Sequence, residues 1–315
     1  MIWVAWRQQR TETVIAAALL VLFAALLLPT GLHMASAFDH DRLSACLGRD
    51  RPPSCGNAVD AFTERFHQIG SFIAWFTLVP GVIGVLLAAP FVGQFEDGTY
   101  RLDWTQSITR RRWIAAKLGL AVGAAVLASL AFVLLVTWWR SPLVRLEGRM
   151  DNSVFDSEGI VVIGYTLFAL GLALAVGALW RRAVPAIVVA FGGYFAARLF
   201  VDTWLRQRLL APLTATWRTD GKDPAGLFHA WVLNEYPSDR LGHPVRLVPG
   251  HCLNVPKGAK PVDPGCLFRP ATYLHAVYEP ATRFWTLQGI ETAIFGGVAI
   301  GLIAFAAWWS NRQSG

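Results

Sequence analysis

Six apolar stretches, each about twenty residues long, constrain the fold of this chain more than any other feature. A membrane helix needs about 20 mainly apolar residues to cross a hydrocarbon core about 30 Å thick. Hydrophobic residues make up 54% of the chain and charged residues only 16%, which is little charge for a soluble protein of 315 residues. The stretches are residues 13–32, 71–92, 114–139, 159–180, 183–201 and 287–309. We therefore predict an all-α integral membrane protein with six transmembrane helices.

The ends of these stretches carry many of the tryptophans, and the spans contain prolines. Tryptophan collects at the headgroup level of a bilayer, so Trp113, Trp139 and Trp180 support the predicted boundaries. Pro80 and Pro90 are tolerated in a membrane helix because neighbouring helices can satisfy the freed carbonyl groups.

Residues 1–12 precede the first span and hold Trp3 and Trp6 beside Arg7 and Arg10. The apolar run that follows is too long for the core of a cleavable signal peptide, so it reads as a retained anchor. The placement of tryptophan and arginine favours an amphipathic N-terminal helix that lies in the membrane interface. A frayed polar terminus is the alternative.

The orientation of the spans follows from the loops. Basic residues, including Arg110, Arg111 and Arg112, are modestly more frequent in the segments that share a side with the N-terminus. Such a bias marks the cytoplasmic side, so we expect both termini to be cytoplasmic in a bacterial plasma membrane.

Four cysteines all fall in the predicted outer loops. Cys46 and Cys55 share the first loop, and Cys252 and Cys266 share the last one. Close pairs on one side suit oxidising surroundings, so we predict the disulfides Cys46–Cys55 and Cys252–Cys266, a pairing chosen by locality alone. His251 with the last pair could instead ligate a metal, but the spacing lacks the C-x-x-C pattern, and we predict no metal site.

Residues 202–286 form the longest polar stretch and are rich in proline and glycine. We predict a small extracytoplasmic cap, stapled by a disulfide, between spans five and six. Its flanks, TWLRQRLL and ATYLHAVYEPATRFW, read as helical, with loops or short strands such as VRLV between them. The predicted organisation is therefore residues 1–12, spans one to five over 13–201, the cap, and the last span with a short tail over 287–315.

Sequence motifs for several kinds of catalysis and nucleotide binding are absent from the chain. The chain has no G-x-x-x-x-G-K-[ST] phosphate loop, no H-E-x-x-H pair and no G-x-S-x-G elbow, so we expect no ATPase site, no bound cofactor and no catalytic residues. The net charge is +7, but the arginines are scattered through loops rather than gathered on one face, so nucleic-acid binding is not expected.

The loop over residues 94–113 is the most specific polar segment. Asp97 or Thr99 can cap a short helix, and Tyr100 and Trp104 share one face of it at i and i+4. A rigid helix held between two spans can take a push from a cytoplasmic partner and pass it to both. An ordinary positively charged loop would explain the three arginines but not the spacing of the polar residues and glycine, which are Glu96, Gly98, Thr99, Thr105 and Gln106.

The spacing E-x-G-T…L…T-Q…R…W…K in this segment resembles ABC-2-type ABC transporter permeases, as does the opening WVAWRQQR. The resemblance implies a dimer of six-span subunits in the lipid bilayer, in which the loop between spans two and three docks on a separate ABC ATP-binding protein. ATP and magnesium would then bind to that partner. The coupling residues implied are Glu96, Gly98, Thr99, Leu102, Thr105, Gln106 and Arg110.

The expected function is that of a permease subunit that exports a hydrophobic or amphipathic compound. The alternatives are a membrane sensor or immunity protein whose cap binds an external ligand, or an intramembrane enzyme. Two charges also lie inside predicted spans, Arg198 in the fifth and Glu291 in the sixth, where charge is costly unless paired or hydrated. We expect an ion pair between them, or between Arg198 and Asp202; the alternative is that Arg198 and Glu291 line a substrate path.

Overall fold

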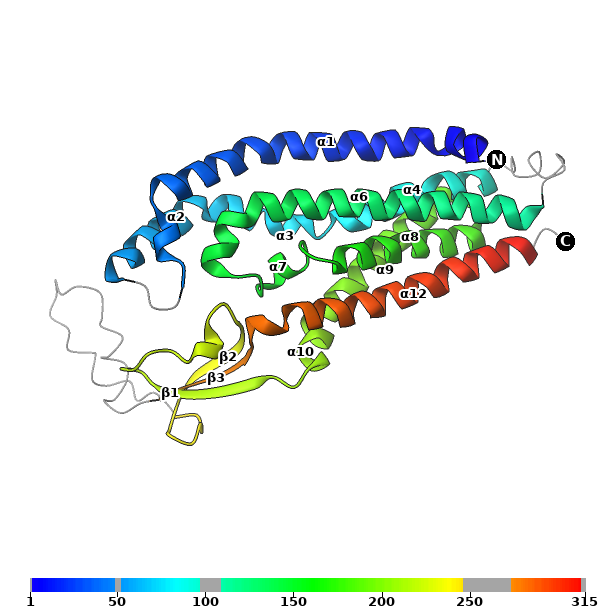
Figure 1. The fold of residues 1–315 in the computed structure, drawn as a ribbon. Coiled ribbons are helices and arrows are strands. Elements are labelled where there is room, and N and C mark those ends of the chain that lie inside the picture. Colours follow the sequence, from blue (N-terminus) through cyan, green and yellow to red (C-terminus); the bar gives the residue numbers. More distant parts are fainter. Residues whose placement is uncertain (1, 49–51, 97–108, 246–272, 313–315) are drawn as a thin grey trace, which may run out of the picture.

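The computed structural model describes residues 2–48, 52–96, 109–245 and 273–312. It shows a long helical bundle with a small β-sheet at one end (Figure 1). Within these residues, six helical segments are long and apolar enough to cross a membrane, which confirms the predicted number of spans.

The spans are built from seven helices: α1 Ile2–His40, α3 Ile73–Phe76 with α4 Val79–Glu96, α6 Arg110–Glu147, α8 Val161–Trp180, α9 Ala183–Phe200 and α12 Phe284–Arg312. Short elements connect them: η1 Leu43–Cys46, α2 Pro53–Ser71, α7 Asn152–Phe155, the π-helical turn η2 Val201–Leu205, α10 Arg206–Leu209, η3 Ala225–Leu227 and η4 Ala281–Arg283. The strands are β1 Leu213–Arg218, β2 Trp231–Ser238 and β3 Tyr273–Glu279.

Both ends of the drawn chain lie at one end of the bundle, together with the end of α4 and the turn between α8 and α9 (Figure 1). We call this the terminal end. The sheet, α2 and α7 lie at the opposite end, which we call the sheet end (Figure 1). An even number of spans returns the chain to the side on which it began, as this arrangement requires.

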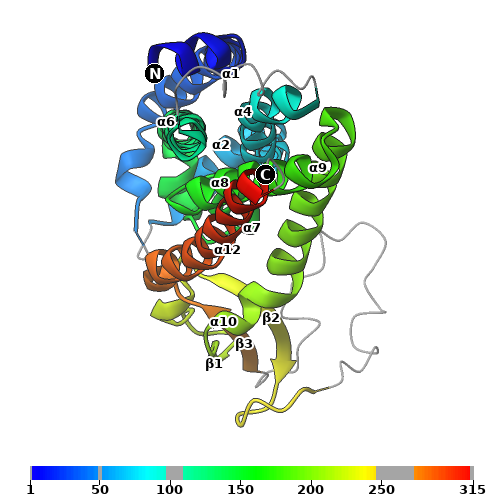
Figure 2. The ribbon, with the colours of Figure 1, turned by 90° about the vertical axis from the view of Figure 1, so that its right-hand side faces the viewer.

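Helix α8 lies in the middle of the bundle, with α4, α6, α9 and α12 around it (Figure 2). Glycines permit its close approach to α4. A Cβ atom on Gly84 would lie 2.4 Å from the carbonyl oxygen of Thr166, and one on Gly177 would lie 2.3 Å from Val92 Cγ2. Small residues at such crossings let two membrane helices pack backbone to backbone.

Helix α1 lies at the edge of the bundle against α6, and most of its spanning part is exposed. The indole Nε1 of Trp139 donates a hydrogen bond of 3.0 Å to Thr30 Oγ1, which links the two helices. Residues 2–12, predicted as a separate interfacial helix, are the first turns of the same continuous helix α1.

Several helices extend beyond the predicted apolar stretches. Helix α1 continues to His40 rather than Leu32, and α6 continues to Glu147 rather than Trp139. An apolar stretch ends at the first polar residues, whereas the backbone hydrogen bonds of a helix can continue past them into the polar zone of the membrane. The connection between the first two spans is also largely helical, since it contains η1 and α2.

The second span is broken between α3 and α4, just before Pro80. Proline has no N–H group to donate to the preceding turn. The hydroxyl of Tyr194, on α9, donates a hydrogen bond of 2.7 Å to the carbonyl oxygen of Thr77 in this break. A neighbouring span therefore supplies a donor at the irregular turn.

The cap contains a three-stranded antiparallel sheet in the order β1-β3-β2. The prediction of a helical flank over 271–285 was wrong for Tyr273–Glu279, which is the central strand β3. The other flank, TWLRQRLL, is helical and continues α9 through η2 and α10. Most of VRLV lies outside the described residues, which end at Val245 in this part of the chain.

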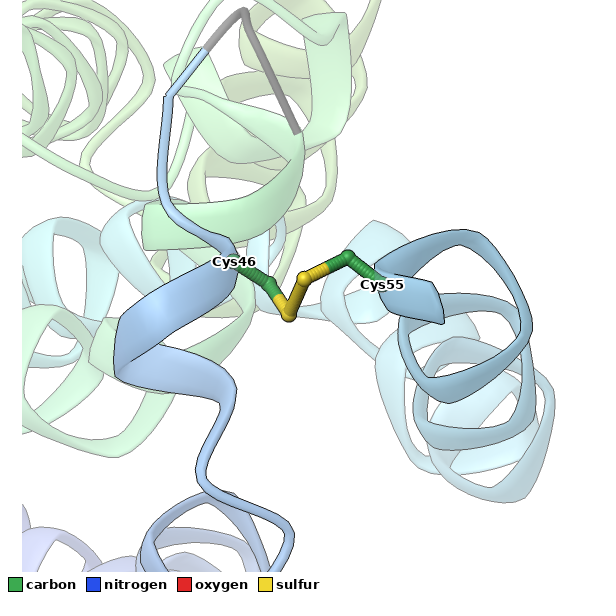
Figure 3. The surroundings of a disulfide bond; sticks show 2 residues. All are labelled: Cys46 and Cys55. Carbon is green, nitrogen blue, oxygen red and sulfur yellow. A yellow bond between two sulfur atoms is a disulfide. The ribbon is translucent and has the colours of Figure 1, made fainter. Parts of the chain in front are cut away.

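Cys46 of η1 and Cys55 of α2 form a disulfide, with Cα atoms 5.5 Å apart (Figure 3). Both cysteines are buried, and the bridge closes a short turn at the sheet end. The second predicted pair, Cys252 and Cys266, lies outside the described residues.

Candidate functional site

Four almost fully buried charged residues at the sheet end pair with one another, and we call them the charge cluster. They are Asp156 at 5% exposure, Arg198 at 6%, Arg206 at 1% and Glu291 at 0%. Charges at such depth are costly unless they are paired and hydrogen-bonded.

Four different elements bring these residues together. Asp156 follows the short helix α7, Arg198 lies on α9, Arg206 begins α10, and Glu291 lies on α12. Asp151 sets the position of α7, because its side chain accepts a hydrogen bond of 3.0 Å from the backbone N–H of Ser153. The cluster therefore joins the connection between the third and fourth spans to the fifth and sixth spans.

Glu291 is the central acceptor of the charge cluster. Its Oε1 accepts hydrogen bonds from the hydroxyl of Tyr165 at 2.5 Å, from Arg198 Nη1 at 3.1 Å and from Arg206 Nη2 at 3.1 Å. Its Oε2 accepts from Arg206 Nε at 3.0 Å. Both carboxylate oxygens are thus satisfied by charged or polar donors.

Asp156 pairs with both arginines. Its Oδ1 lies 2.5 Å from Arg206 Nη2, and its Oδ2 forms an ion pair with Arg198. Arg206 also donates to Asp202 Oδ1 at 2.9 Å and to Asn152 Oδ1 at 3.3 Å.

Aromatic rings cover the planes of the two guanidinium groups. The guanidinium carbon of Arg198 lies 3.8 Å from the ring centroid of Tyr165, and that of Arg206 lies 4.3 Å from the ring of Phe155. Such stacking stabilises an arginine where water is excluded.

Gln288 fastens α12 to the segment that leads into α8. Its Oε1 accepts from the backbone N–H of Val161 at 2.9 Å, and its Nε2 donates to the carbonyls of Phe155 at 2.9 Å and Glu158 at 3.0 Å. Gly159 has a φ of 77°, and a Cβ atom there would lie 2.7 Å from Gln288 Oε1. Glycine is therefore required at this turn.

Glu158 lies beside this turn, outside the spans, and its side chain is only 2% exposed. Its Oε2 lies 3.6 Å from Arg149 Nε, while its Oε1 has no hydrogen-bond partner among the described residues. Burial raises the pKa of Glu158 to about 7, although Arg149 and Arg140 oppose the rise.

At the terminal end, side chains tie together the helices that flank residues 97–108. The carboxylate of Glu96 accepts a hydrogen bond of 2.7 Å from the backbone N–H of Ala183, at the start of α9. The ammonium group of Lys117 on α6 donates to Gln94 on α4, and it lies 4.3 Å from the ring centroid of Trp113. These contacts connect α4 with both α6 and α9.

The structure brings Arg198 and Glu291 together as an ion pair, while Asp202 pairs with Arg206 rather than with Arg198. Among the predicted coupling residues, Glu96 ends α4 and Arg110 begins α6. The other coupling positions lie outside the described residues: Gly98, Thr99, Leu102, Thr105 and Gln106.

Sequence reasoning missed Asp156 and Arg206. The spacing of Arg198, Asp202 and Arg206 at i, i+4 and i+8 places them on one face of a helix, and this signal could have identified Arg206. Asp156 carries no comparable signal, since it lies in a short polar connection. Within the described ranges, no three His, Cys, Asp or Glu side chains form a group that could hold a metal ion.

Comparison with known proteins places the chain in a family. Residues 17–206, more than half of the 315 residues, match the family described as ABC-2 membrane transporter related. The match covers the first five spans and ends at Arg206, so β1, β2, β3 and α12 lie beyond it. No curated protein and no solved structure matches the chain. The chain therefore belongs to the ABC-2 membrane transporter related family, as a multi-pass transmembrane subunit of an ABC transporter whose family works with an ATP-binding subunit.

Proposed function

We propose that this chain is an export permease that a separate ABC ATP-binding protein drives through residues 94–113. The observation that carries the proposal is the pair of contacts at the terminal end. Glu96 joins α4 to α9, and Gln94 joins α4 to Lys117 on α6. A force applied to this segment would reach three spans at once.

Coupling requires an element with two states. ATP binding can drive transport only if the ATPase binds one conformation of the permease better than another. The hydrogen bond between Glu96 and Ala183 is suited to this role because it lies on the surface at a helix N-terminus, where one carboxylate contact is readily made and broken.

The rest of the proposal follows the family resemblance. The terminal end faces the cytoplasm of a bacterium, and the ATPase, with ATP and magnesium, docks there. The subunit works as a dimer with itself or with a related permease, and it exports a hydrophobic or amphipathic compound. Apolar side chains exposed along α1 and α9, such as Leu26 and Val188, suit contact with lipid or a second subunit.

The test is co-purification and ATPase activity with the candidate ATP-binding subunit. We expect Glu96→Ala to insert normally but to lower permease-stimulated ATPase activity about tenfold, because it removes the hydrogen bond to Ala183. A tenfold change corresponds to about 1.4 kcal/mol of coupling free energy. Glu96→Gln keeps an acceptor for the N–H of Ala183 and should retain most of the activity. Gly98→Pro should detach or uncouple the ATPase.

Glu64→Gln is the matched control, since Glu64 is exposed on α2 at the sheet end. Unchanged co-purification and unchanged ATPase activity in both Glu96→Ala and Gly98→Pro would refute the coupling role. A ligand sensor would show no ATPase stimulation even in the unmodified chain, so the same assay separates the two functions.

A further inference from the structure

A cavity of about 220 Å³ lies beside the charge cluster at the sheet end. Its walls come from α3, the break before α4, α7 and the outer part of α9 with η2. The lining includes Leu78, Asn152, Asp156, Tyr194, Arg198 and Asp202.

One wall of the cavity continues onto the outside of the bundle. Phe195 and Leu199 both line the cavity, yet they are 46% and 47% exposed on the spanning helix α9. Trp75, next to the lining residue Ala74, is 68% exposed. The cavity is therefore bordered by apolar side chains at the depth of the membrane, in the leaflet at the sheet end.

The charges of the charge cluster and Asp202 do not balance, and three of these five residues, Asp156, Arg198 and Asp202, line the cavity. Two arginines face three carboxylates, which leaves one negative charge in excess. The residues are Arg198, Arg206, Asp156, Asp202 and Glu291.

Asp202 is the carboxylate that can meet a ligand. Its side chain is 28% exposed, against 6% for Asp156 and 0% for Glu291. Among the described residues it makes one ion pair, through Oδ1 to Arg206, whereas Asp156 and Glu291 each pair with both arginines. A negative charge next to apolar walls attracts a cation more strongly than it would in water.

We propose that this cavity binds the cationic head of an amphipathic amine, whose apolar tail lies along Phe195 and Leu199 in the membrane. The head would pair with Asp202, and the ring of Tyr194 in the lining would favour an ammonium group further. The inference rests on the proposed export function only in treating the amine as a transported compound. Binding itself requires no ATPase.

The test is a titration of the full chain in nanodiscs with three probes that share one tail: octylamine, octanol and octanoate. Heats from empty discs are subtracted to remove partitioning into lipid. Octylamine is charged at pH 7, as lysine is. We expect it to bind at least about tenfold more tightly than octanol, with octanoate weakest.

Four variants connect this preference to the cavity. Asp202→Asn should abolish the preference for octylamine, Asp202→Glu should keep it, and Asp60→Asn on α2 should not change it. Ala74→Phe, which fills the cavity, should weaken all three probes. Circular dichroism before each titration identifies any variant that fails to fold, and Asp202→Glu then remains as the informative comparison.

The proposal is overturned if the unmodified chain binds the three probes equally, if octanoate binds best, or if Asp202→Asn keeps the preference for octylamine. Discs with and without an ethanolamine phospholipid separate the two sources of an amine. Competition by the phospholipid identifies a lipid ligand, and unchanged affinity identifies a soluble amphiphile; both support a site for a cationic head. If the chain shows no preference for octylamine but Glu96→Ala still lowers ATPase activity, this inference alone fails. If the preference is present but Glu96→Ala leaves ATPase activity unchanged, only the coupling role fails.

Discussion

Glu291→Gln tests whether the charge cluster holds the last span in place. Glu291 is 0% exposed and accepts four hydrogen bonds of 2.5 to 3.1 Å, three of them from guanidinium groups. Removing one partner of a buried ion pair costs about 3–5 kcal/mol. Glutamine keeps one carbonyl acceptor, and two carboxylates remain for the two arginines, so we expect a loss near the lower end, about 3 kcal/mol.

The assay is unfolding of the purified full chain in mixed micelles by titration with a denaturing detergent, followed by circular dichroism. Glu64→Gln, an exposed glutamate of α2, should stay within about 0.5 kcal/mol of the unmodified chain. The single variants Arg198→Met and Glu291→Met each leave a buried charge without its partner. The double variant should therefore lose less stability than the sum of these two single losses, because both charges of the pair are removed together. A loss below about 1 kcal/mol in Glu291→Gln, or strict additivity in the double variant, would refute the reasoning.

Three further predictions concern other parts of the molecule. The pKa of Glu158 is raised from 4.5 to about 7, so its contribution to the free energy of unfolding is full below pH 4.5 and falls by about 3 kcal/mol as the pH rises through 7. Glu158→Gln should remove this pH dependence when unfolding is measured at several pH values. Opening the Cys46 disulfide by Cys46→Ser should destabilise its ten-residue loop by about 2–3 kcal/mol, and unchanged hydrogen exchange there would contradict this. Gly84→Ala should cost about 1–3 kcal/mol because its Cβ would lie 2.4 Å from the Thr166 carbonyl oxygen, whereas Gly93→Ala, with nothing within 4 Å, should be neutral in the same assay.

Part of the site could be predicted from single residues. Arg198 and Glu291 stand out because each is a charge inside an apolar stretch, and such charges need a partner. Their pairing with Asp156 and Arg206 could not be predicted, because these two belong to short elements whose position depends on how three spans pack. The contact between Glu96 and Ala183 joins residues far apart in the chain, and no local pattern indicates it.

The cap illustrates the same limit. Residues 273–279 read as helical in isolation, yet they form the central strand β3 because β1 and β2 pair with both of its edges. Those partners lie tens of residues earlier in the chain, so the strand is a product of tertiary pairing. β-structure depends more on such neighbours than helical structure does.

The sequence by itself determined the six spans, because the thickness of the bilayer sets the length of each apolar stretch and a helix satisfies its own backbone. It also identified the segment 94–113 as the most specific polar loop. Only the tertiary structure decided which charges share one buried cluster, where the cavity beside Asp202 lies, and how Glu96 meets α9. These features depend on distances between spans, which the packing of side chains sets and which the order of residues along one helix does not contain.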